Sequence, residues 1–105
     1  MEKTVIDLSN KDLQLNERLY TKFAHDMRSL LFDLYYAGVP VPLTVKGTQQ
    51  QVDAFMRALK GEKKYMDAYM KHGLGDSRTM MNKRDLDSAV RGFEGETGLR
   101  WPFKN

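Results

Sequence analysis

Few side chains in this 105-residue chain have the types and spacing that catalysis or metal binding requires. His25 and His72 have no partner ligand at a spacing that chelates zinc. The acidic pairs at positions 85/87 and 94/96 are two residues apart, so on a helix each pair points to different sides and cannot act as a carboxylate dyad. Gly75-Asp76-Ser77 matches only a fragment of a serine-hydrolase motif. We therefore expect no catalytic residue, no metal site and no cofactor, and we do not expect an enzyme.

Basic residues form a candidate anion-binding edge in the middle of the chain. Residues 41–82 carry seven basic and four acidic side chains, whereas residues 1–40 carry five basic and six acidic ones. By the 3.6-residue period, four of the basic residues share one edge of a predicted helix, and three more follow in the next loop and helix start. These candidates for nucleic-acid or other anion binding are Arg57, Lys60, Lys64, Lys71, Arg78, Lys83 and Arg84.

Two acidic residues on the same edge support a different interpretation. Asp53 and Asp67 precede Arg57 and Lys71 by four residues, which is the spacing of stabilising surface ion pairs. We favour a solvated helix face held by such pairs, and anion or nucleic-acid binding is the alternative.

The aromatic residues give a second candidate surface. Phe32 and Tyr36 are four residues apart and lie almost opposite the main apolar stripe of the first predicted helix, so its last two turns are apolar on two sides. Either the closing segment with Trp101 and Phe103 folds back over them, or another molecule does, because exposed aromatic patches usually mark interfaces. These four residues are the candidate protein interface.

Three helices must position these side chains, and capping signals mark their ends. Each start pairs a capping residue with a polar partner three positions on, and each stop is a glycine followed by an apolar residue. The starts are Ser9 with Asp12, Thr48 with Gln51 and Asn82 with Asp85, and the stops are Gly38, Gly73 and Gly98. With the apolar periodicity, these signals predict helices over residues 10–37, 49–72 and 83–97. The first helix has an alternative start near Asn16, and Gly61 leaves a break in the second open, although we favour one continuous helix.

Short β-prone segments complete the fold. Residues 3–7, 43–46 and 99–103 are the candidate strands, and the segment 43–46 needs a partner from the opening segment, the closing segment or another copy of the chain. The sequence thus predicts a mainly helical α+β fold with two or three short strands, in one domain over residues 1–105.

The composition narrows the class of protein. Hydrophobic residues at 41% and charged residues at 30% are typical of a globular chain, and the absence of cysteine excludes a disulfide scaffold and a thiolate metal site. No apolar run approaches the roughly 20 residues that span a bilayer, and the N-terminus has no apolar signal core. We therefore expect a cytoplasmic protein that does not enter a membrane.

These observations together predict a small, non-enzymatic interaction or regulatory module. Its expected partner is another protein or a second copy of itself, bound through the aromatic residues, which would make the chain a homo-oligomer in the second case. The alternative is a nucleic-acid or other anion binder that uses the basic edge and the loop after it.

Overall fold

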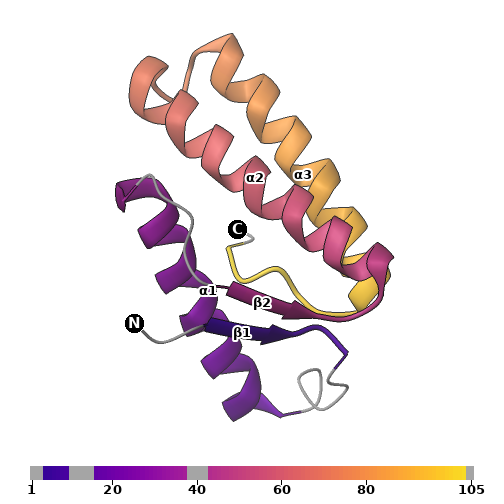
Figure 1. Cartoon of the computed structure of the whole chain (residues 1–105). Helices are drawn as coiled ribbons and strands as arrows, with labels where there is room; N and C mark the ends of the chain where they lie inside the picture. Colours follow the sequence, from indigo (N-terminus) through magenta and orange to yellow (C-terminus); the bar gives the residue numbers. More distant parts are fainter. Residues whose placement is uncertain (1–3, 10–15, 38–42, 104–105) are drawn as a thin grey trace.

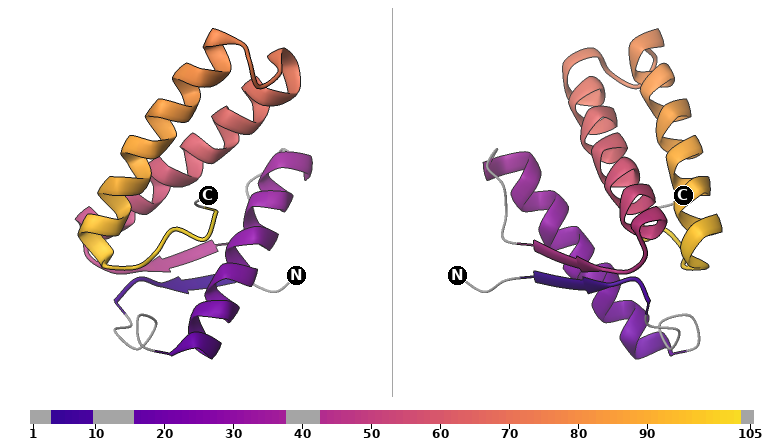
Figure 2. Two further views of the ribbon diagram at one scale, coloured as in Figure 1. Left: turned by 180° about the vertical axis from the view of Figure 1, so that it is seen from behind. Right: turned by 45° about the vertical axis from the view of Figure 1, so that its right-hand side comes forward.

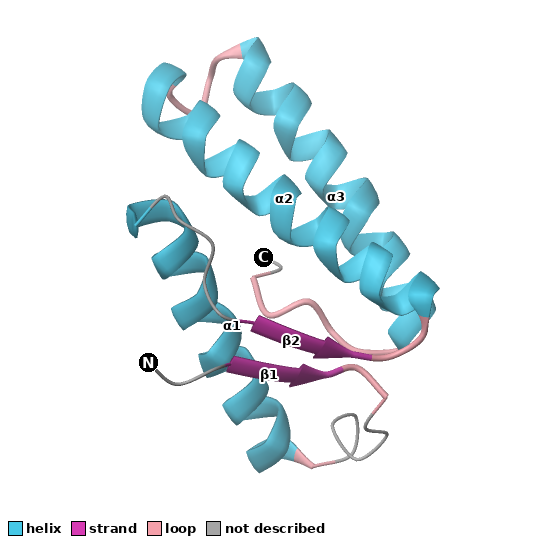
Figure 3. Cartoon of the chain, in the orientation of Figure 1, coloured by secondary structure: helices cyan, strands magenta, loops and turns pink. Residues whose placement is uncertain are grey.

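The computed structural model describes residues 4–9, 16–37 and 43–103, without the side chains of Thr4, residues 34–37 and Leu43, and it places three helices and two strands in them (Figure 1). The elements are β1 (Thr4–Asp7), α1 (Glu17–Ala37), β2 (Leu43–Lys46), α2 (Gln49–His72) and α3 (Ser77–Thr97). Figure 3 shows that helices dominate the chain and that the strands form one small sheet. The predicted class, mainly helical α+β, is confirmed.

The two strands form a parallel pair, in which Thr4 lies opposite Leu43 and the register continues to Asp7. Parallel neighbours cannot be joined by a tight turn, and α1 lies on the connection between them. Ile6 is buried and Val5 is exposed, as the alternation of a strand with one covered face requires. Of the three partners that the sequence left open for residues 43–46, the opening segment is the one observed.

The closing segment is not a strand, so the prediction over residues 99–103 is wrong. Its backbone groups form hydrogen bonds with side chains instead of with a neighbouring strand. The Trp101 N–H donates to Glu94 Oε2 at 2.9 Å, and the Arg100 carbonyl accepts from the Tyr20 hydroxyl at 2.7 Å. Pro102 has no N–H to offer a neighbouring strand. The segment therefore runs back between α1 and the two C-terminal helices in irregular conformation (Figure 2).

Helix α1 begins at the later of its two predicted starts. Asn16 Oδ1 accepts the N–H groups of Arg18 and Leu19 at 3.0 and 3.3 Å, which caps the first turn. Ser9 belongs to the turn after β1, where its hydroxyl donates to Asp7 Oδ1 at 2.6 Å. The predicted first turns, with Asp12, and the predicted stop at Gly38 lie outside the described residues.

Helix α2 has the predicted ends and no break. Thr48 Oγ1 accepts the Gln51 N–H at 3.1 Å while Gln51 Oε1 accepts the Thr48 N–H at 2.9 Å, so the capping box is complete. The helix passes through Gly61 and stops at Gly73, whose N–H donates to the Tyr69 carbonyl at 2.9 Å. The continuous helix that we favoured is confirmed.

Helix α3 begins at Ser77, well before the predicted start at residue 83. Asp76 is the capping residue, because its Oδ1 accepts the Arg78 N–H at 2.8 Å. Asn82, the predicted cap, lies inside the helix, and its Nδ2 donates to the Arg78 carbonyl at 2.9 Å. The predicted stop is confirmed, since Gly98 adopts the left-handed conformation at φ 74°.

Helices α2 and α3 form an antiparallel hairpin that is packed along its length (Figure 1). Small residues on α2 let the helices approach closely: Ala58 and Ala68 are buried, and a Cβ atom at Gly61 would lie 3.3 Å from Leu86 Cδ1. Near the turn, the buried Thr79 hydroxyl donates to the Ala68 carbonyl at 3.2 Å. The hairpin seam thus depends on the absence of side-chain bulk on this face of α2.

One hydrophobic core joins the sheet, the three helices and the closing segment. Its buried members are Ile6, Leu8, Phe23, Met27, Leu30, Leu31, Phe55, Ala58, Leu59, Leu86, Ala89, Val90, Phe93, Leu99 and Trp101. The closing segment therefore contributes to the core in spite of its irregular backbone.

Candidate functional site

Trp101, predicted as an interface residue, is buried in the core of its own chain with 2% of its surface exposed. Its ring lies 5.1 Å from that of Phe93 and 6.4 Å from that of Phe55, measured between centroids, and both contacts are edge-to-face. Phe103 is half-buried against it, at 5.8 Å. Of the four aromatic candidates, these two come together, and they pack within the chain.

Phe32 lies elsewhere. It is on α1 and 60% exposed, and the closing segment places its tryptophan against α2 and α3 instead. The side chain of Tyr36 lies outside the part of the chain that the structure describes. The predicted four-residue interface is therefore divided between an exposed α1 residue and a buried closing segment.

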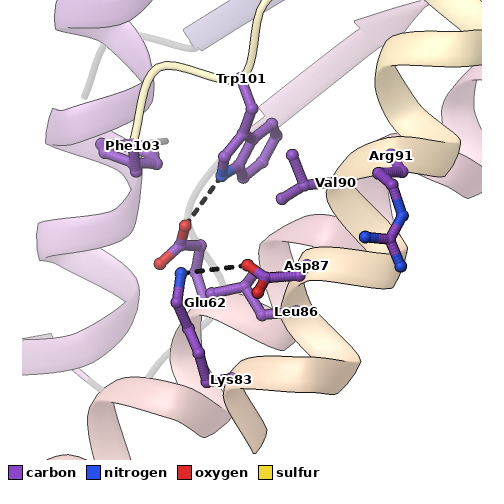
Figure 4. Close-up of a pocket in the computed structure, with 8 residues that line it drawn as sticks. All are labelled: Glu62, Lys83, Leu86, Asp87, Val90, Arg91, Trp101 and Phe103. Carbon is purple, nitrogen blue, oxygen red and sulfur yellow. Dashed lines mark hydrogen bonds and ion pairs between the residues drawn. The ribbon is translucent and has the colours of Figure 1, made fainter. Parts of the chain in front are cut away.

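A pocket of about 430 Å³ lies beside Trp101, between α2, α3 and the closing segment (Figure 4). Its apolar walls are formed by Leu86, Val90, Trp101 and Phe103, and its charged lining residues are Glu62, Lys83, Asp87 and Arg91. A volume of this size is within the range of small-molecule sites, about 300–1,000 Å³. The pocket is therefore a candidate ligand-binding site.

Glu62 is the buried charge in this pocket, with 7% of its surface exposed. Its Oε1 accepts the Trp101 indole N–H at 2.8 Å, which ties α2 to the closing segment. Burial raises the pKa of the Glu62 carboxyl, because the charged form loses water, while the Trp101 hydrogen bond and the charge of Lys83 act in the opposite direction. Lys83 itself is paired with Asp87 at 3.0 Å. A carboxyl group with a perturbed pKa in a partly apolar pocket is a common mark of a binding site.

The raised pKa predicts how stability changes with pH. The folded chain holds the Glu62 proton more tightly than the unfolded chain does, so this stabilising contribution is complete below the ordinary pKa of 4.5 and is lost as pH rises through the raised pKa. In Glu62→Gln, the amide oxygen can still accept the indole N–H without a charge. We therefore expect that, relative to wild type, this variant gains stability from pH 4.5 to neutral pH, as measured by urea unfolding.

Glu62→Leu is the control for the hydrogen bond. It also removes the charge, but it leaves the Trp101 indole N–H without its acceptor, which costs about 1–3 kcal/mol for a buried group. If the wild-type chain instead gains stability relative to Glu62→Gln as pH rises from 4.5, the pKa of Glu62 is not raised in the folded chain.

Glu62 was missed in the sequence, although its spacing contains the signal. It follows Phe55 by seven residues and Leu59 by three, so all three lie on one face of α2, and all three are buried. The next residue, Lys63, is partly exposed and paired with Asp67 at 3.1 Å. A charged residue spaced with buried apolar residues on one helix face was therefore the signal for this site.

The basic candidates fall into two groups. Arg57, Lys60, Lys64, Lys71 and Arg84 are exposed and form no ion pair with any residue in the described ranges. Arg78 and Lys83 are engaged by acidic neighbours, at 3.0 Å from Asp76 and from Asp87. The structure therefore leaves five of the seven cations without an acidic partner among its described residues.

The ion pairs expected on the edge of α2 are replaced by others. Asp67 pairs with Lys63 on its N-terminal side instead of with Lys71, and Asp53 accepts from the Gln49 amide at 2.8 Å instead of pairing with Arg57. Both carboxylates reach one turn back along the helix, so the prediction of these two pairs was wrong.

The turn between α2 and α3 gathers exposed apolar side chains. Among the described residues, five of the seven exposed large hydrophobic side chains lie between positions 69 and 81. We call them the hairpin-end surface: Tyr69, Met70, Leu74, Met80 and Met81. Leu74 and Met80 also line a hollow of about 220 Å³ with Tyr65, Thr79, Lys83 and Arg84.

In the described part of the chain, no three histidine or acidic side chains gather where they could hold a metal ion. None of its helices combines the length and the apolar character needed to cross a bilayer. Comparisons of the chain with protein-family models, curated proteins and solved structures find no match.

Proposed function

We propose that the chain is a small protein-binding module and that it binds its partner at the hairpin-end surface. The observation that carries this proposal is the exposure of Tyr69, Met70, Leu74, Met80 and Met81, which lies between 44% and 67%. Scattered surface hydrophobics need no explanation, but a concentration of them at one end of a fold is typical of interaction sites. Leu74 and Met80 line the hollow, and three of the five residues are methionines, whose flexible side chains adapt well to varied partners.

The charge of this end favours an acidic partner. Residues 69–84 contain four basic side chains and one acidic side chain, and that excess equals the net charge of +3 of the whole chain. Lys71 and Arg84 are exposed there and have no ion pair with described residues. Two copies meeting end to end would bring like charges together, which disfavours self-association through this surface. The occupant we infer is an amphipathic segment of another protein, apolar on one face and acidic at its edges.

Selection from a displayed library of helical peptides tests this proposal. Peptides enriched on the full chain are expected to carry apolar residues at i, i+3 or i+4 and i+7 with Asp or Glu beside them. Leu74→Ser/Met80→Ser is expected to weaken their binding at least tenfold in fluorescence polarisation. Phe32→Ser is the matched control, because it also removes an exposed apolar side chain, and it is expected to leave the affinity unchanged.

Four outcomes would overturn the proposal. Enriched peptides that bind Leu74→Ser/Met80→Ser as tightly as wild type would exclude this surface, and a loss confined to Phe32→Ser would move the interface to α1. A dimer in sedimentation velocity that the double variant abolishes would make the occupant a second copy. The nucleic-acid alternative would be established if no peptide is enriched and mixed oligonucleotides bind in a salt-sensitive way that Lys60→Glu/Lys64→Glu abolishes.

A further inference from the structure

The pocket beside Trp101 contains an acceptor that the fold leaves available. Glu62 Oε1 accepts the indole N–H, whereas Oε2 accepts no hydrogen bond from any residue that the structure describes. No unpartnered side-chain oxygen or nitrogen is sealed away from solvent in the described part of the chain, so Oε2 keeps exposed surface, and Glu62 lines the pocket. Figure 4 shows one carboxylate oxygen directed to the indole and the other directed away from it. A residue with only 7% of its surface exposed thus presents a carboxylate oxygen without a hydrogen-bond donor among the described residues to a cavity.

The other charged groups of the pocket do not satisfy this oxygen. Lys83 Nζ donates to Asp87 Oδ1 at 3.0 Å, so its charge is already paired. Arg91 belongs to α3 and lies on the far side of Asp87 from Glu62 (Figure 4). Glu62 Oε2 is therefore a carboxylate oxygen without a hydrogen-bond donor among the described residues, in a pocket that is also lined by Trp101 and Phe103, whose rings meet edge-to-face at 77°.

We propose that this pocket binds a primary ammonium group carried on a short apolar chain, with the ammonium at Glu62 Oε2 and the chain against Trp101 and Phe103. An ammonium supplies the donors that the free carboxylate oxygen lacks, and aromatic faces attract cations. The volume of about 430 Å³ is ample for such a chain, since a cavity of about 150 Å³ already holds benzene. The group can belong to a free amine or to a lysine side chain of a peptide, and the two sources share this chemistry.

This inference does not depend on the proposed protein-binding surface. The ligand differs in charge from the acidic segment expected at the hairpin end, and the walls of the pocket belong to the closing segment as well as to α2 and α3. Either proposal can therefore fail while the other stands.

Trp101 is the only tryptophan of the chain, so its indole N–H gives a single, assigned signal in a ¹H–¹⁵N spectrum. Titration with n-hexylamine is expected to shift this signal with saturation, and n-hexanol, the uncharged analogue, is expected to bind at least tenfold more weakly. Nα-acetyl-lysine methylamide tests the peptide source with the same readout. Binding of the amine is expected to weaken as pH falls and Glu62 becomes protonated.

Glu62→Gln removes the charge and keeps an acceptor for the indole, so the fold is retained and amine affinity is expected to fall at least tenfold. Asp85→Asn is the matched control, because it changes the net charge equally at an exposed α3 position that does not line the pocket. The proposal is overturned if n-hexylamine and n-hexanol bind equally, or if neither amine probe gives a saturable shift. It is also overturned if Glu62→Gln keeps the full amine affinity, or if Asp85→Asn loses as much affinity as Glu62→Gln.

Discussion

Trp101→Ala is expected to lower the free energy of unfolding by about 3–5 kcal/mol, as truncation of a large buried aromatic does. Trp101 is 2% exposed and its ring contacts those of Phe55, Phe93 and Phe103, so the substitution leaves a cavity where the closing segment meets the hairpin. It also removes the indole N–H from Glu62, so a buried carboxyl loses its donor. Small domains have a total stability of only about 5–15 kcal/mol, so this loss is a large fraction of the total.

Urea unfolding followed by circular dichroism is the appropriate measurement, since the variant has no tryptophan fluorescence. Trp101→Phe separates the two causes, because it keeps an aromatic ring and removes only the indole N–H and part of the volume. We expect it to retain more stability than Trp101→Ala. A loss below about 1 kcal/mol in Trp101→Ala would be far below the cost of emptying a core position and would exclude the closing segment from the core.

Local signals predicted the ends of α2 and the end of α3 because capping is a local interaction. The Thr48 and Gln51 side chains exchange hydrogen bonds with backbone groups three residues away, and Gly98 is needed for its own φ angle. The start of α3 was wrong for a related reason: Asp76 and Asn82 both have capping side chains, and the sequence does not show which one lies outside the helix. Asn82 instead bonds to the carbonyl one turn before it, which a helical asparagine can also do.

The site needed information that no local pattern contains. The buried position of Trp101 depends on the path of the closing segment between distant elements, and it is fixed by bonds such as that of Tyr20 to the Arg100 carbonyl, across eighty positions. Glu62 could be found from its spacing to Phe55 and Leu59, but its role depends on Trp101. The exposure of the hairpin-end surface could not be predicted either. Apolar residues at helical spacing look like core residues until the positions of the neighbouring elements are known.

Gly61→Leu is expected to destabilise the chain by about 1–3 kcal/mol or more, as overpacking of a tight contact does. A Cβ atom at this position would lie 3.3 Å from Leu86 Cδ1 and 3.4 Å from Leu86 Cα, and the second of these atoms belongs to the backbone of α3. A leucine must therefore push the two helices apart along the seam. The gain from replacing a helical glycine, about 1 kcal/mol, works against this cost and is too small to offset a displaced helix.

Gly92→Leu is the matched control, because it makes the same exchange in α3 where a Cβ atom would meet nothing within 4 Å. There the helical preference acts alone, and we expect a gain of about 0.5–1 kcal/mol in the unfolding free energy. The difference between the two variants, measured by urea unfolding under the same conditions, isolates the cost of bulk at the seam. If Gly61→Leu is as stable as Gly92→Leu, α2 and α3 do not approach each other at Gly61 as closely as the structure places them. Because Glu62 and Leu86 line the pocket beside this contact, a wedge at Gly61 is also expected to shift the Trp101 indole signal, whereas Gly92→Leu should leave it in place.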